Sequence, residues 1–230
     1  MEDEQYNKGA LYIVASPIGN LEDITLRALG VLQDVDLIYC EDTRVTRRLL
    51  ERCDIKNKEL RSLNARTEER KIEEVIYELK QGKTIAYLTD AGTPAISDPG
   101  VRLVARARKA RARVVPIPGP SALIAALSVA GAPTNKFCFF GFLPQKKGRQ
   151  SILQEIAEKQ ETIVLYESTH RIVKFLKEAQ EFFPNKKITL ARELTKMHEE
   201  ILQGNAEELL GILENNPQKQ KGEFVVIISK

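Results

Sequence analysis

The sequence predicts an α/β protein with two domains, a parallel sheet in the N-terminal half and a mixed sheet in the C-terminal half. In the first half, short apolar strands alternate with helical patterns, until the turn formers Gly131–Asn135 interrupt the alternation. In the second half, two strand patterns follow one another without a helix between them. With 230 residues, 43% of them hydrophobic, the chain can bury one large core or two small ones.

Strands joined by helices account for the N-terminal half. Each apolar run is followed by a helical pattern, an alternation that predicts a parallel sheet. The expected strands are Leu11–Ala15, Val35–Cys40, Thr84–Leu88 and Arg113–Ile117. The expected helices are Asp23–Gln33, Thr43–Cys53, Thr67–Gln81, Pro99–Ala110, whose proline suits a first turn, and Ser121–Ala130.

A second domain is expected after the turn formers, so the two domains are predicted at residues 1–131 and 132–230. Its expected strands are Phe137–Phe142, Thr162–Tyr166, Lys187–Ala191, Glu199–Gln203 and Glu223–Ser229. Its expected helices are Gln150–Lys159, Thr169–Phe182 and Ala206–Leu213, followed by a polar loop at Asn215–Lys221. Adjacent strands without a crossover helix predict a mixed sheet.

Composition excludes several classes of protein. The 35 Lys and Arg against 32 Asp and Glu give a net charge of only +3, which by itself does not indicate nucleic acid. The acidic start Met1–Gln5 lacks a signal-peptide pattern, so a cytoplasmic protein is expected. The uncharged stretch Val114–Asn135 is broken by Pro116, Pro118 and Pro120, which argues against a membrane span.

No metal site is predicted. The three cysteines, Cys40, Cys53 and Cys138, lack CxxC spacing and fall in apolar surroundings, where cysteine acts as a small hydrophobe. The two histidines, His170 and His198, are far apart and have no neighbouring ligand types.

Ligands of open α/β sheets bind where loops leave the carboxyl ends of the strands. Four polar loops with Gly or Pro fall there: Ser16–Asn20, Glu41–Arg44, Thr89–Pro94 and Pro118–Ala122. The first has one glycine rather than GxGxxG, so it does not predict a dinucleotide site. Helix capping is the alternative role of four residues in or beside these loops, Asp42, Thr43, Asp98 and Ser121.

The same loops carry a family resemblance. The chain resembles the ribosomal RNA small-subunit methyltransferase I family, within the tetrapyrrole methylases, in an ordered set of motifs from Leu11 to Ser229. The motifs are Ser16–Leu29, Glu41–Arg44, Asp90–Pro94, Pro118–Ala122, Gly141–Pro144, Tyr166–Arg171, Ala191–Lys196 and Glu199–Glu200. One stretch departs from the family: Ser62–Glu68 stands where a His-Glu-His-Asn-type stretch is usual, so no histidine role transfers.

The resemblance implies a tetrapyrrole-methylase-like fold, in which two α/β domains hold S-adenosylmethionine in the cleft between them. It also implies 2′-O-methylation of a cytidine ribose in small-subunit (16S) ribosomal RNA, by a homodimer that acts on the rRNA or the 30S subunit. The residues matching the cofactor motifs are Pro17, Asp90, Gly92, Thr93, Ser121, Ala122, Glu167 and Glu193.

Candidate catalytic residues follow from the reaction. A sulfonium methyl donor is already activated, so the enzyme mainly positions a nucleophile in line with the methyl group. A ribose hydroxyl also needs a base or a nearby cation. Glu41 and Asp42 are the first candidates for base or orienting roles, and Glu193 and Glu199 are alternatives. Asp42 as a helix N-cap, with Glu41 as its charge complement, is the structural alternative.

Local basic clusters predict the RNA contacts. One lies on the helix after Glu41 and one in the loop after Pro144, and their candidate phosphate ligands are Arg44, Arg47, Arg48, Lys146, Lys147 and Arg149. A third stripe, Arg102, Arg106 and Lys109, is better explained as a solvated helix face.

Two other functions stay open at this point. A methyltransferase of the same fold acting on a tetrapyrrole or another small molecule would not need the basic clusters. A noncatalytic RNA-binding assembly factor would keep the basic surface but not the cofactor site, and calorimetry with S-adenosylmethionine separates it from both enzymes.

Overall fold

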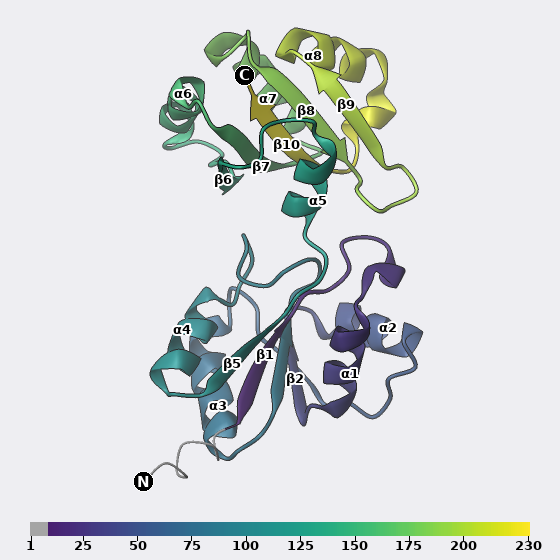
Figure 1. The fold of residues 1–230 in the computed structure, drawn as a ribbon, viewed down its shortest axis with the longest axis vertical. Helices are drawn as coiled ribbons and strands as arrows, with labels where there is room; N and C mark the ends of the chain where they lie inside the picture. The colour runs from purple at the N-terminus through teal and green to yellow at the C-terminus, as the bar shows by residue number, and fades with distance from the viewer. Residues whose placement is uncertain (1–8) are drawn as a thin grey trace. The chain divides into compact units, whose positions relative to one another are not determined.

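The computed structural model describes residues 9–230, which form two compact units, unit 1 up to Ser121 and unit 2 from Ala122 (Figure 1). The acidic segment Met1–Gln5 lies outside the described residues. The division falls before helix α5 (Ala122–Val129), whereas the turn formers predicted it after that helix. Helix α5 is assigned to unit 2 because its apolar residues pack on the sheet of that unit.

Unit 1 contains the predicted parallel sheet, and its five strands lie in the order β3-β2-β4-β1-β5. Its strands are β1 (Ala10–Val14), β2 (Leu37–Cys40), β3 (Leu60–Ser62), β4 (Ile85–Leu88) and β5 (Arg113–Ile117). The sequence pattern missed the edge strand β3, which has only three half-buried residues.

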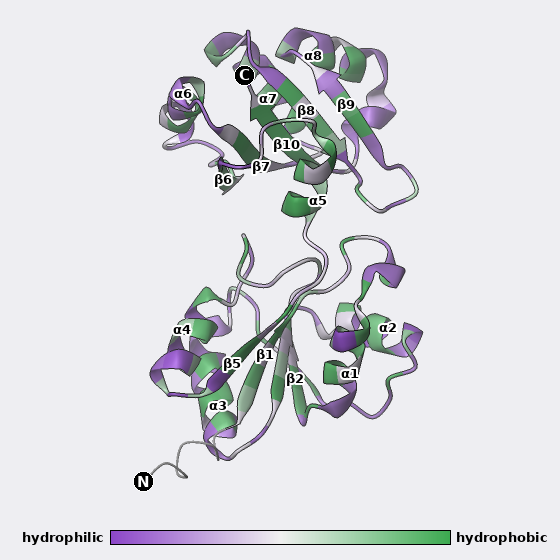
Figure 2. Cartoon of the chain, in the orientation of Figure 1, coloured by the Kyte–Doolittle hydropathy of each residue, from purple (hydrophilic) through white to green (hydrophobic). Residues whose placement is uncertain are grey.

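Helices cover both faces of this sheet. They are α1 (Leu26–Asp34), α2 (Thr43–Arg52), α3 (Glu68–Lys80) and α4 (Val101–Lys109), with a short 3₁₀ turn η2 (Leu21–Asp23) before α1. Alternate strand residues point to opposite faces, so Leu11 packs with α3 and α4 while Val14 packs with α1 and α2. Figure 2 shows the sheet as mostly hydrophobic and the outer helix faces as mixed. The apolar strand runs are explained by burial on both faces.

Unit 2 contains the predicted mixed sheet, and its strands lie in the order β6-β7-β10-β8-β9. Only β6 and β7 pair in parallel, and the other neighbours are antiparallel. The strands are β6 (Phe137–Phe142), β7 (Thr162–Ser168), β8 (Lys187–Arg192), β9 (Glu200–Gly204) and β10 (Glu223–Ser229).

The helices of unit 2 divide between the two faces of its sheet. Helices α6 (Arg149–Glu158), α7 (Ile172–Phe182) and α8 (Ala206–Asn215) pack on one face, and α5 packs on the other. The predicted polar loop after α8 contains the 3₁₀ turn η3 (Pro217–Gln220). Within residues 9–230, no helix is long and apolar enough to cross a membrane.

Candidate active site

The four predicted loops meet at one edge of the unit 1 sheet, here called the carboxyl edge. Ser16, after β1, exchanges two backbone hydrogen bonds with Gly92, after β4, at 2.9 and 3.0 Å. The buried Ser16 hydroxyl donates to the carbonyl of Thr89 at 2.9 Å. The Thr93 hydroxyl donates to the carbonyl of Pro120, after β5, at 3.2 Å. The loops after β1, β4 and β5 therefore hold one another in place.

The loop after β2 joins the same edge through its carboxylates. The Asp42 amide donates to Oδ1 of Asp90 at 3.1 Å, and the Asp90 amide faces Oε2 of Glu41 at 3.5 Å. The Asp42 side chain also caps α2 by accepting from the Arg44 amide at 2.8 Å. The structure thus brings Glu41, Asp42 and Asp90 together, and the predicted capping role of Asp42 is confirmed.

The neighbouring carboxyl groups differ in proton affinity. Burial raises the pKa of Glu41, and the charges of Asp90 and Asp42 raise it further. Partial burial also raises the pKa of Asp90, although the hydrogen bond from the Asp42 amide lowers it. The Arg44 guanidinium, which forms hydrogen bonds with both oxygens of Asp42, lowers the pKa of Asp42 to about 2. Glu41 is therefore better suited than Asp42 to accept a proton near neutral pH.

Helix capping, the alternative role predicted for Asp98, is wrong for α4, because Gly100 occupies its N-cap position. Burial raises the pKa of Asp98 from its ordinary 3.8 to about 6, and Glu41 and Asp90 contribute to this rise. The carboxyl group of Asp98 therefore belongs electrostatically to the carboxyl edge. The position of Asp98 in the loop after β4 indicates the carboxyl edge in the sequence. The partial burial of its side chain is visible only in the structure.

We expect Asp98→Asn to change how stability depends on pH. Because the pKa of Asp98 is higher in the folded protein than its ordinary 3.8, the protonated carboxyl stabilises the fold fully below that value. This stabilisation is lost as pH rises through about 6. The amide variant cannot ionise, so its melting temperature relative to wild type should rise between about pH 4.5 and about pH 7.5. Melting curves that differ by a constant amount across this range would contradict the assignment.

The cofactor residues predicted in unit 1 lie on the carboxyl edge. Gly92 has φ +75°, a conformation that favours glycine, and an added Cβ would meet only Ile18 Cγ2 at 3.5 Å. Its backbone N–H and C=O both pair with Ser16, so Gly92 offers close approach rather than a free N–H donor. Asp90 supplies an exposed carboxylate with an elevated pKa beside the same loop. An open backbone cradle beside carboxylates fits a cationic sulfonium cofactor.

Three predicted cofactor residues lie in unit 2: Ala122 begins α5, and the carboxylates Glu167 and Glu193 have partners within that unit. The fully buried Glu167 pairs with Arg171 at 3.0 Å and accepts from the Ser168 amide at 2.9 Å. Glu193, at φ +50°, pairs with Lys196 at 3.0 Å. These contacts account for both carboxylates structurally, and their cofactor role stays a prediction from the resemblance.

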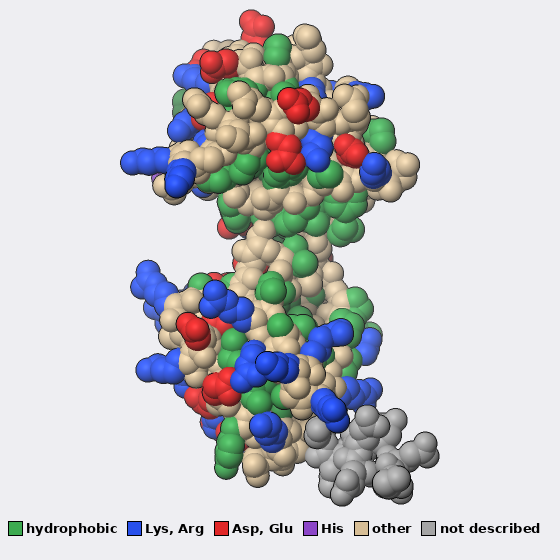
Figure 3. Space-filling model, turned by 90° about the vertical axis from the view of Figure 1, so that its left-hand side faces the viewer, with side chains coloured by type: hydrophobic (Ala, Val, Ile, Leu, Met, Phe, Trp, Pro, Cys, Tyr) green, Lys and Arg blue, Asp and Glu red, His purple; other side chains and the backbone are tan. Residues whose placement is uncertain are grey.

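The basic clusters differ in how available their charges are. Arg44, Arg47 and Arg48 are exposed on α2, although Arg44 pairs with Asp42. Figure 3 shows the face of unit 1 that carries α3 and α4, where many Lys and Arg side chains are spread among other residues. On that face Arg106 pairs with Glu73, as expected for a solvated helix surface.

Arg149 differs from the two lysines of the predicted basic cluster after Pro144. Lys146 and Lys147 are exposed in the loop before α6, but the side chain of Arg149 is only 4% exposed. Its guanidinium pairs with Glu178 at 2.6 Å and donates to the carbonyl of Pro144 at 3.1 Å. Arg149 therefore holds the loop on α7, and its contact with RNA stays a prediction.

No group of three potential ligands among the described residues is placed to hold a metal ion. The three cysteines are free thiols. In the stretch that departs from the family motif, the Asn64 side chain accepts from the amides of Arg66 and Thr67 at 3.1 and 3.2 Å. Asn64 thus builds the turn that leads into α3.

Comparison with known proteins identifies the class. A family model described as "Tetrapyrrole (Corrin/Porphyrin) Methylases" matches residues 10–210. A ribosomal RNA small subunit methyltransferase I from Escherichia coli O157:H7 is 47% identical over 96% of this chain and 78% of its own length. The protein of that name from Thermotoga maritima is 43% identical over 96% of this chain and 98% of its own length.

Solved structures agree on the fold. A cobalt precorrin-4 methyltransferase of cobalamin biosynthesis matches with a TM-score of 0.68 at 19% identity, over 95% of this chain and 94% of that one. The uroporphyrin-III-C-methyltransferase from Thermus thermophilus matches with a TM-score of 0.66 at 21% identity, over 97% and 95%. The family model and the ribosomal RNA methyltransferase relatives, together with the carboxyl edge, define an S-adenosylmethionine-dependent methyltransferase. The chain belongs to the tetrapyrrole methylase family.

Proposed function

We propose that this protein methylates the ribose 2′-hydroxyl of a cytidine in small-subunit (16S) ribosomal RNA. The observation that carries the proposal is the identity of 47% and 43% to two proteins named ribosomal RNA small subunit methyltransferase I, each over 96% of this chain. The corrin and porphyrin enzymes share 19% and 21% identity, which supports the fold alone. A small-molecule substrate therefore has no comparable support.

The carboxyl edge of unit 1 would carry the chemistry. S-adenosylmethionine, when bound, supplies a methyl group that is already activated, so the protein mainly has to orient the hydroxyl. Asp90 and Ser121 would hold the cofactor at the loops after β4 and β5. Glu41 would accept the hydroxyl proton, because its partly buried carboxylate has a raised pKa. Asp42 would orient Glu41 through their shared contacts with Asp90.

Exposed cations would hold the RNA. Arg47 and Arg48 lie five and six residues after Asp42, the residue that caps α2, so phosphate contacts there would lie near the carboxyl edge. Lys146 and Lys147 would add contacts in unit 2. The resemblance also implies a homodimer in the cytoplasm, acting on the rRNA or the 30S subunit, and light scattering of the purified protein measures the oligomer.

Mapping ribose methylation in rRNA from cells that lack this gene tests the proposal. We expect one cytidine of the small-subunit rRNA to lose its 2′-O-methyl group and to regain it when the wild-type gene is returned. Glu41→Gln should lower the rate of methylation of purified subunits about a hundredfold or more, the typical contribution of a general base.

Glu51→Gln is the matched control, because it removes an exposed carboxylate from α2. It should methylate at the wild-type rate. A small-subunit rRNA whose ribose methylation is the same with and without the gene would overturn the proposed substrate. Wild-type activity in Glu41→Gln would overturn only the assignment of the base.

A further inference from the structure

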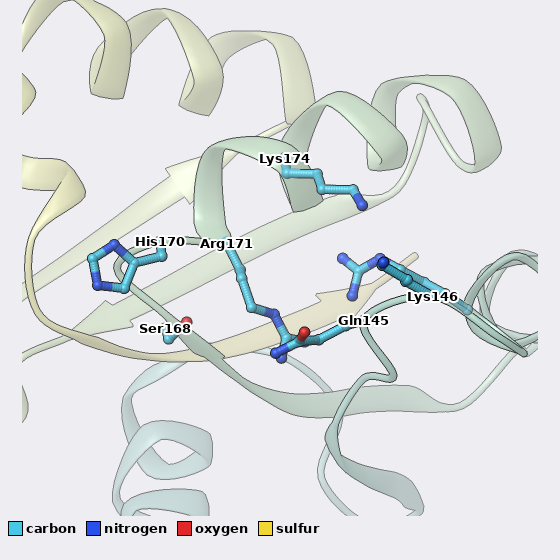
Figure 4. A pocket seen from close by; sticks show the side chains of 7 residues that line it. Gln145, Lys146, Ser168, His170, Arg171 and Lys174 are labelled. Atoms are coloured by element: carbon cyan, nitrogen blue, oxygen red, sulfur yellow. The ribbon is translucent and has the colours of Figure 1, made fainter.

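A basic pocket of about 390 Å³ opens in unit 2, outside the carboxyl edge. It is lined by side chains from the loop before α6 and from the start of α7: Gln145, Lys146, Arg149, Ser168, His170, Arg171 and Lys174. Figure 4 shows Arg171 and Lys174 reaching from α7 toward the loop that carries Gln145 and Lys146, whereas the His170 ring lies at the opposite end of the view. A second hollow shares Lys146 and Lys174 and extends along the loop.

The charges of the pocket do not cancel. Two of its cations form ion pairs, Arg149 with the half-buried Glu178 and Arg171 with the fully buried Glu167. Lys146 forms no ion pair with any residue in the described range. The Lys174 ammonium is 3.8 Å from Glu178 and its side chain is 60% exposed. Four cations against two carboxylates leave two positive charges.

The two paired arginines, Arg149 and Arg171, anchor the elements that line the pocket. Arg149 donates to the carbonyl of Pro144 and pairs with Glu178 on α7, and Arg171 donates to the carbonyl of Leu143, so both hold the loop against α7. Lys146 and Lys174 are thereby presented on the same hollow by two anchored elements. The first turn of α7 also lacks a side-chain cap, and its N–H groups favour an anion.

We propose that this pocket binds a backbone phosphate of the RNA substrate, with Lys146 and Lys174 as its ligands. This inference rests on the proposed function and deepens it, because it names a phosphate subsite in unit 2. Phosphate oxygens accept hydrogen bonds only, and the pocket offers ammonium donors together with the Ser168 hydroxyl and the Gln145 amide. The position of a phosphate here carries no base information, so the subsite sets the register of the RNA rather than its sequence.

The test compares Lys174→Ala with Lys177→Ala. Both lysines are exposed on α7, at 60% and 59%, but Lys177 pairs with Glu214 and does not line the pocket. The probe is the 30S subunit from cells lacking this gene, with affinity measured from about 50 to about 200 mM salt. Lys174→Ala should bind about tenfold more weakly, with the slope of log affinity against log salt reduced by about one. Lys177→Ala should match wild type.

Further variants distinguish a failure of the phosphate subsite from a failure of the proposed function. Lys174→Arg keeps the charge and should restore the wild-type slope, while Lys146→Ala should behave like Lys174→Ala. Calorimetry with S-adenosylmethionine should give wild-type affinity for all of them. A wild-type slope in folded Lys174→Ala would overturn the phosphate subsite and leave the proposed function intact. Failure of the wild-type protein to bind or methylate the subunit would overturn both.

Discussion

Asp90→Asn is expected to weaken S-adenosylmethionine binding by about tenfold to a hundredfold, the effect of losing one charged hydrogen bond. Asp90 lies on the carboxyl edge, where its Oδ1 accepts from the Asp42 amide at 3.1 Å. An asparagine oxygen can still accept this bond, so the substitution removes the charge while keeping the anchor between two loops. Titration calorimetry of the purified protein measures the loss without depending on activity.

Two further variants at the same edge separate the loss of charge from the loss of the loop anchor and from steric exclusion of the cofactor. Asp90→Ala removes both charge and anchor and should bind at least as weakly as Asp90→Asn. Ser121→Phe should weaken binding because a bulky ring would fill the space beside the Thr93–Pro120 contact. Asp36→Asn is the control, since Asp36 contacts Thr84 just before β2 and β4, at the opposite edge of the sheet. Unchanged affinity in both Asp90→Asn and Ser121→Phe would remove the cofactor from this edge.

The sheets were predictable because burial on both faces requires apolar runs. Strand β5 (Arg113–Ile117) and strand β6 (Phe137–Phe142) have the predicted bounds. Strand β3 was not predictable, because three residues are too few to show a period and its pairing to β2 depends on a partner elsewhere in the chain.

The carboxyl edge was predictable for a topological reason. In a parallel sheet the loops after successive strands emerge on the same side, so Glu41 and Asp90 could be placed together from strand positions alone. Their proton affinities depend on burial, which the sequence does not report. The same limit applies to Gly92, whose backbone groups pair with Ser16 across more than seventy residues of sequence.

Local composition does not show that Arg149 is buried. The sequence suggests a single basic cluster at Lys146, Lys147 and Arg149, but only the two lysines are exposed. The partner of Arg149 is Glu178, 29 residues away on α7, and a contact at that separation leaves no local signal. The loop therefore contains two kinds of cation, exposed charges that a ligand could bind and a buried one that supports the fold.

Arg149→Met is expected to destabilise the protein by about 3 kcal/mol, because it leaves the half-buried Glu178 without its arginine partner and removes a cation beside the fully buried Glu167. The Arg149 guanidinium donates to Oε2 of Glu178 at 2.6 and 2.8 Å, and it lies 3.8 Å from the fully buried Glu167. Methionine preserves much of the buried stem but neutralises none of this charge. Urea denaturation followed by circular dichroism measures the free energy of unfolding.

Lys147→Met provides the matched control, because it removes an exposed cation from the same loop and should change stability by no more than about 0.5 kcal/mol. The double variant Arg149→Met with Glu178→Leu should recover much of the lost stability, since replacing both members of a buried pair by apolar groups is often neutral. If Arg149→Met unfolds like wild type but binds the 30S subunit more weakly, Arg149 contacts RNA, and the buried ion pair is not its main role.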